Sequence, residues 1–206
     1  MNLLSFERKL WNSGIDFIAG VDEAGRGPLA GPIVAAAVIL DRSHLFNDVL
    51  NGQYGKIRDS KRLTPKKRER LFDFIIENAI SYSIYEVSSQ EIDEIGISAA
   101  NKLAFYNSVL GLGVSAEHIL TDYFKIHEIK PEQQTNIKRG DNLSLSIAAA
   151  SILAKVHRDR LMRLEHEKWP MYGFDRHKGY GTLFHRQTLA KHGPCEIHRK
   201  SFTLLV

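Results

Sequence analysis

The sequence contains only one cysteine, Cys195, among its 206 residues. A disulfide framework and a zinc site built from cysteine thiolates are therefore both excluded. Such scarcity of cysteine is typical of proteins that work in a reducing compartment. We therefore expect a cytoplasmic protein.

Long hydrophobic runs are also missing. The longest apolar segment spans residues 33–40, whereas a helix needs about 20 apolar residues to cross a bilayer. The N-terminal residues place charges inside their apolar pattern, unlike a signal peptide. Repeats, low-complexity tracts and heptads are absent as well. These absences predict a soluble monomer with no membrane partner.

Neither sign of charge is in large excess. The 28 Lys and Arg residues outnumber the 24 Asp and Glu residues by enough to give a net charge of +4, a weak indication of a polyanionic partner. Basic residues gather in segments 56–70, 155–163 and 176–200. Such clusters also occur on solvated helix faces that bind nothing, so they do not by themselves define a binding surface.

The hydrophobic pattern predicts an α/β fold with a mixed sheet. We expect strands at residues 17–21, 33–40, 82–87 and 118–121, and helices at 3–14, 64–79, 97–110, 142–169 and 182–192. The tight glycine-rich turn between the first two strands makes them antiparallel. Residues 41–63 are expected to form a loop. The small residues at 147–154 should allow a helix backbone to approach the sheet closely. We expect a catalytic core over residues 1–169 and a C-terminal extension over 170–206.

Four acidic residues lie where a predicted strand ends or a helix begins: Asp22, Glu23, Asp122 and Asp141. Clustered carboxylates repel one another unless cations compensate, and hard oxygen ligands suit Mg²⁺ or Mn²⁺. Two such ions are suited to phosphoryl displacement. Each acid also has an ordinary interpretation, as a turn residue or, for Asp141, as a helix N-cap. None of the nine histidines has an obvious nucleophile partner.

The turn at residues 25–32, GRGPLAGP, has two interpretations. A glycine-rich turn after a strand can bind phosphate through its backbone N–H groups. It can equally be a tight turn with no ligand. The spacing matches neither the dinucleotide-binding fingerprint nor the phosphate loop of nucleotide hydrolases.

Segment 19–32, AGVDEAGRGPLAGP, resembles the opening signature of bacterial type 2 ribonuclease H, also called ribonuclease HII. Further matching blocks follow in the family's order at 59–63, 140–141, 146–156, 158–160, 178–182, 185 and 198–202. The resemblance implies a ribonuclease H-like mixed sheet flanked by helices, with a small C-terminal helical extension. It also implies a four-carboxylate metal site made of Asp22, Glu23, Asp122 and Asp141.

The same resemblance implies an activity. The protein would be a metal-dependent endonuclease that hydrolyses the RNA strand of RNA/DNA hybrids. It would also cut on the 5′ side of ribonucleotides embedded in duplex DNA, leaving 3′-hydroxyl and 5′-phosphate ends. Gly25, Arg26 and Gly27 match the element that contacts the ribose 2′-hydroxyl, and Tyr180 matches an aromatic residue that stacks on the adjoining deoxyribose. Lys61 and Arg26 would help to hold phosphates.

Two other classes of function remain open at this point. One is a duplex-binding module of the same fold without catalysis, which metal-dependent nicking would exclude. The other is a nucleotide-binding enzyme built on the glycine-rich turn, which the failed spacing disfavours and a nucleotide titration would test. Tyr180 could likewise be a packing aromatic in a glycine-rich turn.

Overall fold

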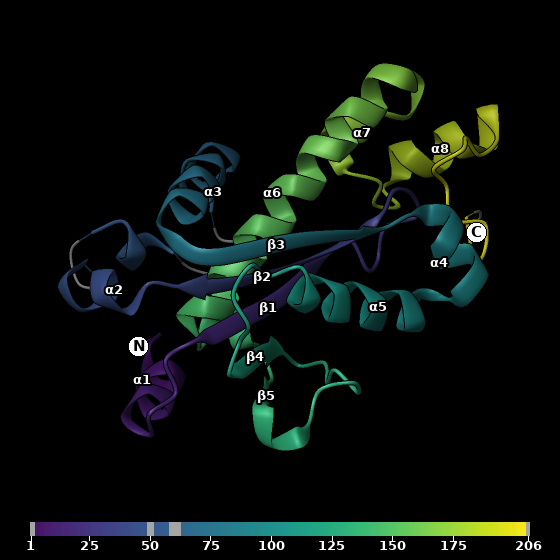
Figure 1. The fold of residues 1–206 in the computed structure, drawn as a ribbon. Helices are drawn as coiled ribbons and strands as arrows, with labels where there is room; N and C mark the ends of the chain where they lie inside the picture. The colour runs from purple at the N-terminus through teal and green to yellow at the C-terminus, as the bar shows by residue number, and fades with distance from the viewer. Residues whose placement is uncertain (1–2, 49–51, 58–62, 205–206) are drawn as a thin grey trace.

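The computed structural model describes residues 3–48, 52–57 and 63–204. Within these residues, one mixed sheet has five strands in the order β3-β2-β1-β4-β5 (Figure 1). The first three strands in sequence are antiparallel neighbours, and β4 and β5 run parallel to β1. The strands are β1 (Ile18–Ala24), β2 (Ile33–Leu40), β3 (Ala79–Val87), β4 (His118–Asp122) and β5 (Gln134–Ile137). The predicted α/β class and mixed sheet are confirmed.

Helices cover both faces of the sheet (Figure 1). The long helix α6 packs on β1 and β2 on one face, beside α3, and α5 packs on the other face. The short helices α7 and α8 lie beyond the end of the sheet with the C-terminal segment. In the described residues, the α-helices are α1 (Ser5–Asn12), α2 (Arg42–Asp48), α3 (Pro65–Asn78), α4 (Ser89–Ile95), α5 (Ile97–Leu110), α6 (Leu145–Lys168), α7 (Phe174–His177) and α8 (Leu183–His192).

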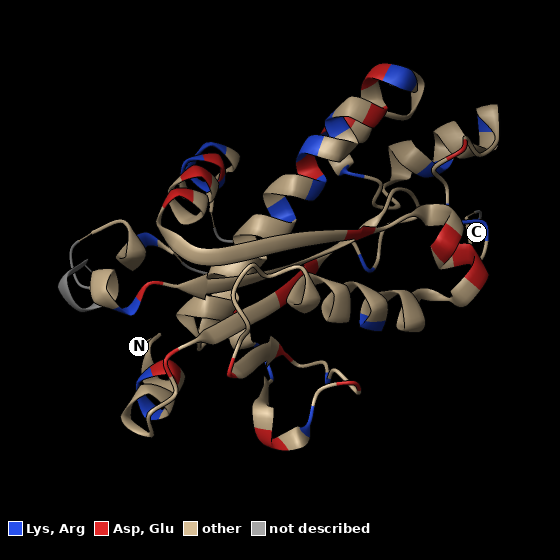
Figure 2. Cartoon of the chain, viewed as in Figure 1, with Lys and Arg blue, Asp and Glu red and all other residues tan. Residues whose placement is uncertain are grey.

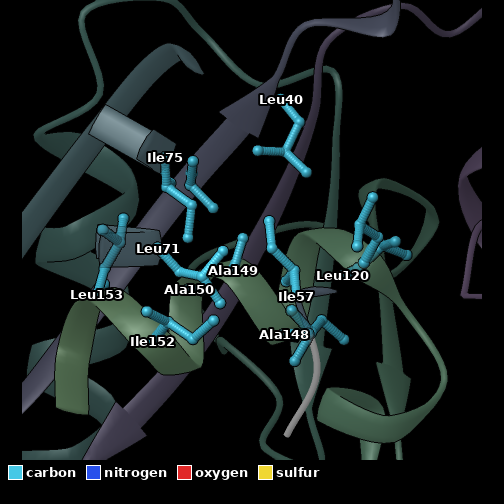
Figure 3. Close-up of a cluster of buried hydrophobic side chains, with 14 of the residues drawn as sticks. Leu40, Ile57, Leu71, Ile75, Leu120, Ala148, Ala149, Ala150, Ile152 and Leu153 are labelled. Carbon is cyan, nitrogen blue, oxygen red and sulfur yellow. The ribbon is translucent and has the colours of Figure 1, made fainter. Parts of the chain in front are cut away.

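The larger core lies between the sheet and α6. All eight residues of β2 are buried, and Leu40, Leu71, Ile75 and Leu153 pack together there (Figure 3). Each fully buried side chain of this size contributes about 1.5–3 kcal/mol. Gly20 on β1 lies directly against the α6 backbone, because a Cβ atom at that position would be 2.1 Å from the carbonyl carbon of Ser146. The close approach expected from the small residues of this helix is therefore present.

Several predicted boundaries were wrong. Segment 41–63 is not a continuous loop, because it contains α2 and a 3-10 turn at Tyr54–Lys56. The long helix begins at Leu145 with Ser144 as its N-cap, so Asp141 is not the cap. Helix α4 was missed although its capping box, Ser88 with Glu91, is visible in the sequence. Strand β5 was missed because it is short and polar.

The C-terminal segment packs through a separate apolar cluster that includes Leu29, Met162, Tyr172 and Phe174. Two buried histidines link this cluster to the backbone. His185 Nδ1 lies 2.9 Å from the Tyr180 carbonyl oxygen, and its Nε2 lies 3.0 Å from His198 Nε2. The amide N–H of Cys195 donates to His198 Nδ1 at 2.9 Å. One proton on each ring, on Nδ1 of His185 and on Nε2 of His198, satisfies these three contacts, so the arrangement fits two neutral rings.

This histidine pair predicts a loss of stability in acid. Burial lowers the pKa of His185 to about 4, so the unfolded chain binds a proton that the folded protein does not between pH 6.5 and 4. Stability should therefore fall by about 3 kcal/mol as pH decreases through that range. Thermal melts at several pH values would measure it. The H185Q variant should show a flatter dependence, whereas H127Q, which changes an exposed histidine, should match the parent.

No helix in the described part of the chain is both long enough and apolar enough to span a membrane.

Candidate active site

Two acidic residues occupy the end of the central strand β1. Asp22 is 5% exposed and faces α6, whose Ser151 hydroxyl donates a hydrogen bond to its carboxylate. The Glu23 amide N–H also donates to Asp22 Oδ1 at 2.8 Å. Burial raises the pKa of Asp22 well above its usual range, and the nearby charges of Glu23 and Asp122 raise it further. Asp22 is therefore a carboxyl group whose ionised form needs a compensating positive charge.

The third predicted acid lies at the end of the neighbouring strand. Because β1 and β4 are parallel, with Val21 opposite Thr121, the next residues, Asp22 and Asp122, reach the same edge of the sheet. Asp122 Oδ1 accepts a hydrogen bond from the Gly140 amide at 2.8 Å. This bond fixes the 3-10 turn Gly140–Asn142 beside the strand end.

Asp141, the fourth predicted acid, belongs to that same turn. It is 4% exposed, and its Oδ1 accepts a hydrogen bond from the Asn142 side-chain amide at 2.8 Å. The turn is entered through Arg139, whose φ of 59° lies in the left-handed region. The fold thus places Glu23 and Asp122 within electrostatic range of Asp22 and attaches Asp141 through the Asp122–Gly140 bond.

The donors in this group suit a divalent cation by their chemistry. They are all carboxylate oxygens, which Mg²⁺ and Mn²⁺ prefer. In the described residues, no group of three or more Asp, Glu, His or Cys side chains is already arranged to hold a metal ion. The fit depends instead on Asp22, since a cation would offset the burial and the repulsion that raise the pKa of its carboxyl group. Movement of the flanking side chains would have to complete the coordination.

A cavity of about 200 Å³ adjoins the acids. Five of the predicted site residues share it, although they come from two separate parts of the sequence. It is lined by Glu23, Ala24, Gly25, Arg26, Gly27, Ser151, Lys155, Arg158 and Tyr180. Lys61 lies outside the described residues. The sequence interpretation missed Ser151, Lys155 and Arg158, although their spacing on α6 places them on one helix face, which is the signal that could have identified them.

The glycine-rich turn and Tyr180 face one another across this cavity. A Cβ atom on Gly27 would lie 4.0 Å from the Tyr180 ring, which is 47% exposed. Gly25 has a φ of 98°, a conformation that L side chains rarely adopt. The Arg26 guanidinium lies 4.4 Å from the centre of the Phe124 ring, so in this conformation it stacks on an aromatic residue that follows β4.

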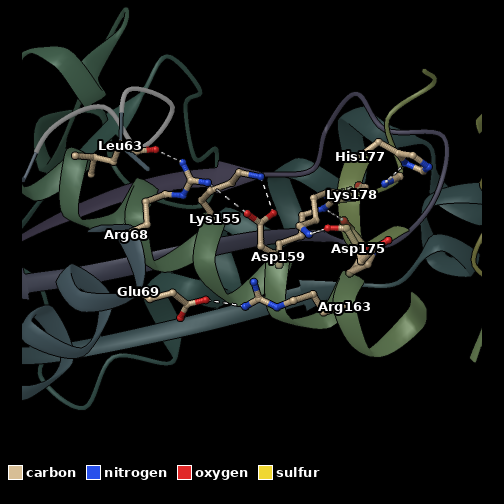
Figure 4. Close-up of polar contacts among 12 residues, drawn as sticks. Leu63, Arg68, Glu69, Lys155, Asp159, Arg163, Asp175, His177 and Lys178 are labelled. Carbon is tan, nitrogen blue, oxygen red and sulfur yellow. Dashed lines mark hydrogen bonds and ion pairs between the residues drawn. The ribbon is translucent and has the colours of Figure 1, made fainter. Parts of the chain in front are cut away.

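Lys155, which lines the cavity, belongs to a group of charged side chains that bond to one another (Figure 4). Asp159 accepts a hydrogen bond from Lys155 Nζ at 2.6 Å and lies 3.8 Å from Arg68 Nη2. Burial lowers the pKa of Lys155, and Asp159 opposes that shift. One carboxylate thus contacts two cations. Basic residues continue along α3 and the second half of α6, interspersed with acids (Figure 2).

Lys155 is expected to contact a substrate phosphate. The K155A variant should bind a nucleic-acid duplex about tenfold less tightly, and the slope of log affinity against log salt should fall by about one. Titrations at several salt concentrations would measure both effects. The matched control is K168A, which changes an exposed lysine on the same helix. An unchanged salt slope in K155A would contradict a phosphate contact.

Comparisons with known proteins agree on one family. The sequence matches the family Ribonuclease HII over residues 19–205. A protein named Ribonuclease HII from Caldicellulosiruptor bescii is 51% identical over 201 residues, which cover 98% of this chain and 93% of the relative. The ribonuclease H2 structure from Pyrococcus horikoshii OT3 superposes with a TM-score of 0.74 at 26% identity, covering 91% of this chain and 94% of that one.

A structure of Bst-RNase HIII in complex with Mn²⁺ shares the fold, with a TM-score of 0.71 at 19% identity over 91% of this chain and 67% of that one.

Proposed function

Because the chain belongs to the ribonuclease HII family, it is a metal-dependent endoribonuclease that acts on RNA/DNA hybrids, and we propose that it also cuts duplex DNA on the 5′ side of an embedded ribonucleotide. The products are a 3′-hydroxyl and a 5′-phosphate. The observation that carries this proposal is the shared cavity, which joins Glu23, the turn at residues 25–27 and Tyr180.

The acids have one proposed task, which is to hold divalent cations. Asp22, Glu23, Asp122 and Asp141 bind one or two Mg²⁺ or Mn²⁺ ions. Bound in a pair, the ions would supply the charge that activates water and stabilises the leaving oxygen. Ser151 orients Asp22 for this task by donating to its carboxylate. Hard-oxygen chemistry favours Mg²⁺ or Mn²⁺, and a structure of Bst-RNase HIII in complex with Mn²⁺ agrees with that pair of ions.

Substrate selection is assigned to the other side of the cavity. The backbone of Gly25, Arg26 and Gly27 contacts the ribose 2′-hydroxyl, the group that distinguishes RNA from DNA. Tyr180 stacks on the sugar of the next deoxynucleotide, and its exposed ring supports that role. Lys61 and Arg26 hold phosphates. The extension over residues 170–206 would position Tyr180 and bind the duplex backbone without reading its sequence.

The decisive experiment uses a labelled DNA duplex with one ribonucleotide, an all-DNA duplex and a continuous RNA/DNA hybrid. Each is incubated with Mg²⁺, with Mn²⁺ or with EDTA. We expect a single metal-dependent nick 5′ to the ribonucleotide and none in the all-DNA control. Cutting of the hybrid alone would remove the junction-reading roles of residues 25–27 and Tyr180. Binding of all three duplexes by folded protein without any cutting would favour the non-catalytic duplex-binding module.

A further inference from the structure

Two buried arginines lie beneath the glycine-rich turn. Arg158 on α6 is 1% exposed and Arg199 near the C-terminus is fully buried. In the described part of the chain, neither guanidinium forms an ion pair with a carboxylate. Burial lowers the pKa of Arg158 to about 10 and that of Arg199 to about 9. A buried charge without an opposite partner is costly, so its hydrogen bonds must compensate.

Backbone carbonyl groups of the turn accept those hydrogen bonds. Arg199 donates to the carbonyl oxygens of Gly25, Arg26 and Gly31 at 2.5, 3.0 and 2.8 Å. Arg158 donates to the carbonyl oxygen of Pro32 at 2.8 Å and to that of Ala30 at 3.0 Å. The carbonyls of the turn are therefore directed into the protein.

The amide groups of the turn have the opposite environment. Among the described residues, no acceptor in the protein pairs with the amide N–H groups of Gly25, Arg26 or Gly27. These three residues line the cavity. The two guanidiniums thus hold the carbonyl side of the turn and leave three N–H donors for a ligand.

Arg158 differs from Arg199 in one respect. Its Nη1 also donates to the carbonyl oxygen of Lys178 at 2.9 Å, two residues before Tyr180. Among the described residues, the Arg199 guanidinium makes no such bond: it donates hydrogen bonds only to carbonyl groups of the turn, and it lies 5.2 Å from the centre of the Phe202 ring. The same guanidinium of Arg158 therefore joins the turn to the segment that carries Tyr180. Close packing reinforces this connection, because a Cβ atom on Gly179 would lie 2.3 Å from the Ala30 carbonyl oxygen.

We propose that Arg158 is a positioning residue for specificity, which fixes the spacing between the turn at residues 25–27 and the Tyr180 ring. This inference rests on the proposed function, in which the turn contacts the ribose and Tyr180 contacts the adjoining deoxyribose. Only a ribose-to-deoxyribose junction uses both contacts at once. Arg158 therefore matters more for cutting at a single ribonucleotide in DNA than for cutting a continuous hybrid. Arg199, which holds the turn alone, affects both substrates equally.

The test measures the ratio of single-turnover rates on the two substrates for each variant. Because both rates come from the same protein sample, a partly inactive sample does not alter the ratio. Arg158→Lys keeps the charge but loses the planar fork that reaches three carbonyls. Arg199→Lys is the matched buried control, and Arg42→Lys is the exposed one. If Arg158→Lys does not melt cooperatively, Arg158→Met is used, since methionine occupies the space of the arginine stem.

We expect Arg158→Lys to lower the junction-to-hybrid ratio roughly tenfold or more, with KM for both substrates nearly unchanged. Arg199→Lys should slow both reactions in parallel, and Arg42→Lys should match the parent. Adding Arg158→Lys to Tyr180→Ala should change the ratio no further, because the two residues act through one contact. An unchanged ratio in Arg158→Lys, or an equal fall in Arg199→Lys, would overturn the proposal. The parent protein is assayed before any variant. If it does not cut at a single ribonucleotide, the proposed function itself fails.

Discussion

Replacing Asp22 with asparagine is expected to reduce cleavage by about a thousandfold or more while the protein remains folded. Asn keeps the shape of the side chain and its place beside Ser151, but it cannot supply the negative charge that a divalent cation requires. Binding to a duplex should be largely retained, because Lys155 and the other basic residues are unaltered. Single-turnover cleavage at several Mg²⁺ and Mn²⁺ concentrations would measure the loss.

The same substitution should raise stability in the absence of metal. The pKa of Asp22 is higher in the folded protein than in the unfolded chain. The folded state then holds a proton that the unfolded state releases, so stability falls as pH rises above the unfolded value of about 3.9. At neutral pH the D22N variant avoids that cost. Its metal-free melting temperature should be equal to or higher than that of the parent.

A matched control separates the loss of cleavage in D22N from the general effect of removing one negative charge. Asp16 is exposed and pairs with Arg42 at the opposite end of β1, so D16N should cut at the parent rate. Mn²⁺ should raise the melting temperature of the parent and of D16N more than that of D22N. Retained cleavage by D22N at every metal concentration would show that Asp22 is not a metal ligand.

The sequence predicted the sheet better than it predicted the surroundings of the site. Strands β1 and β2 are continuous apolar runs joined by a glycine-rich turn, so local pattern and tertiary structure agree there. Asp22 and Asp122 could be paired in advance because the ends of parallel strands meet at one edge of a sheet. The hydrogen-bond partner of Asp122 could not be predicted in the same way. Its bond to the Gly140 amide depends on a turn that begins after Arg139, whose φ lies in the left-handed region.

Side chains on α6 were missed for a different reason. Its first half has so many small and apolar residues that it reads as core, which hides Ser151, Lys155 and Arg158 along one face. Whether such polar residues face solvent, sheet or cavity depends on how the helix is rotated against β1. That rotation is set by tertiary contacts rather than by helix periodicity. Arg199 gave even less signal, because its acceptors lie 168 to 174 residues away in sequence.

One of these tertiary contacts is the close approach of Gly20 to the backbone of α6, and the G20A substitution is expected to have the second largest effect on stability and activity. A Cβ atom there would lie 2.1 Å from the carbonyl carbon of Ser146, 2.2 Å from its oxygen and 2.5 Å from the Ile147 nitrogen. Backbone atoms cannot rotate away as a side chain can, so α6 would have to move off β1. We expect a loss of about 3 kcal/mol in the free energy of unfolding.

Activity should fall in G20A beyond what the loss of folded protein explains. Gly20 and Asp22 point to the same face of β1, because side chains alternate along a strand. A shift of α6 at Gly20 therefore also moves the Ser151 hydroxyl away from the Asp22 carboxylate and opens the cavity wall that carries Lys155. Urea denaturation would give the stability, and cleavage at low temperature would give the rate of the folded fraction. G113A is the matched control, since only Ser81 Oγ, at 3.7 Å, would meet the added methyl group. Equal stability and rate in G20A and G113A would show that α6 tolerates displacement and that the Gly20 contact does not position the site.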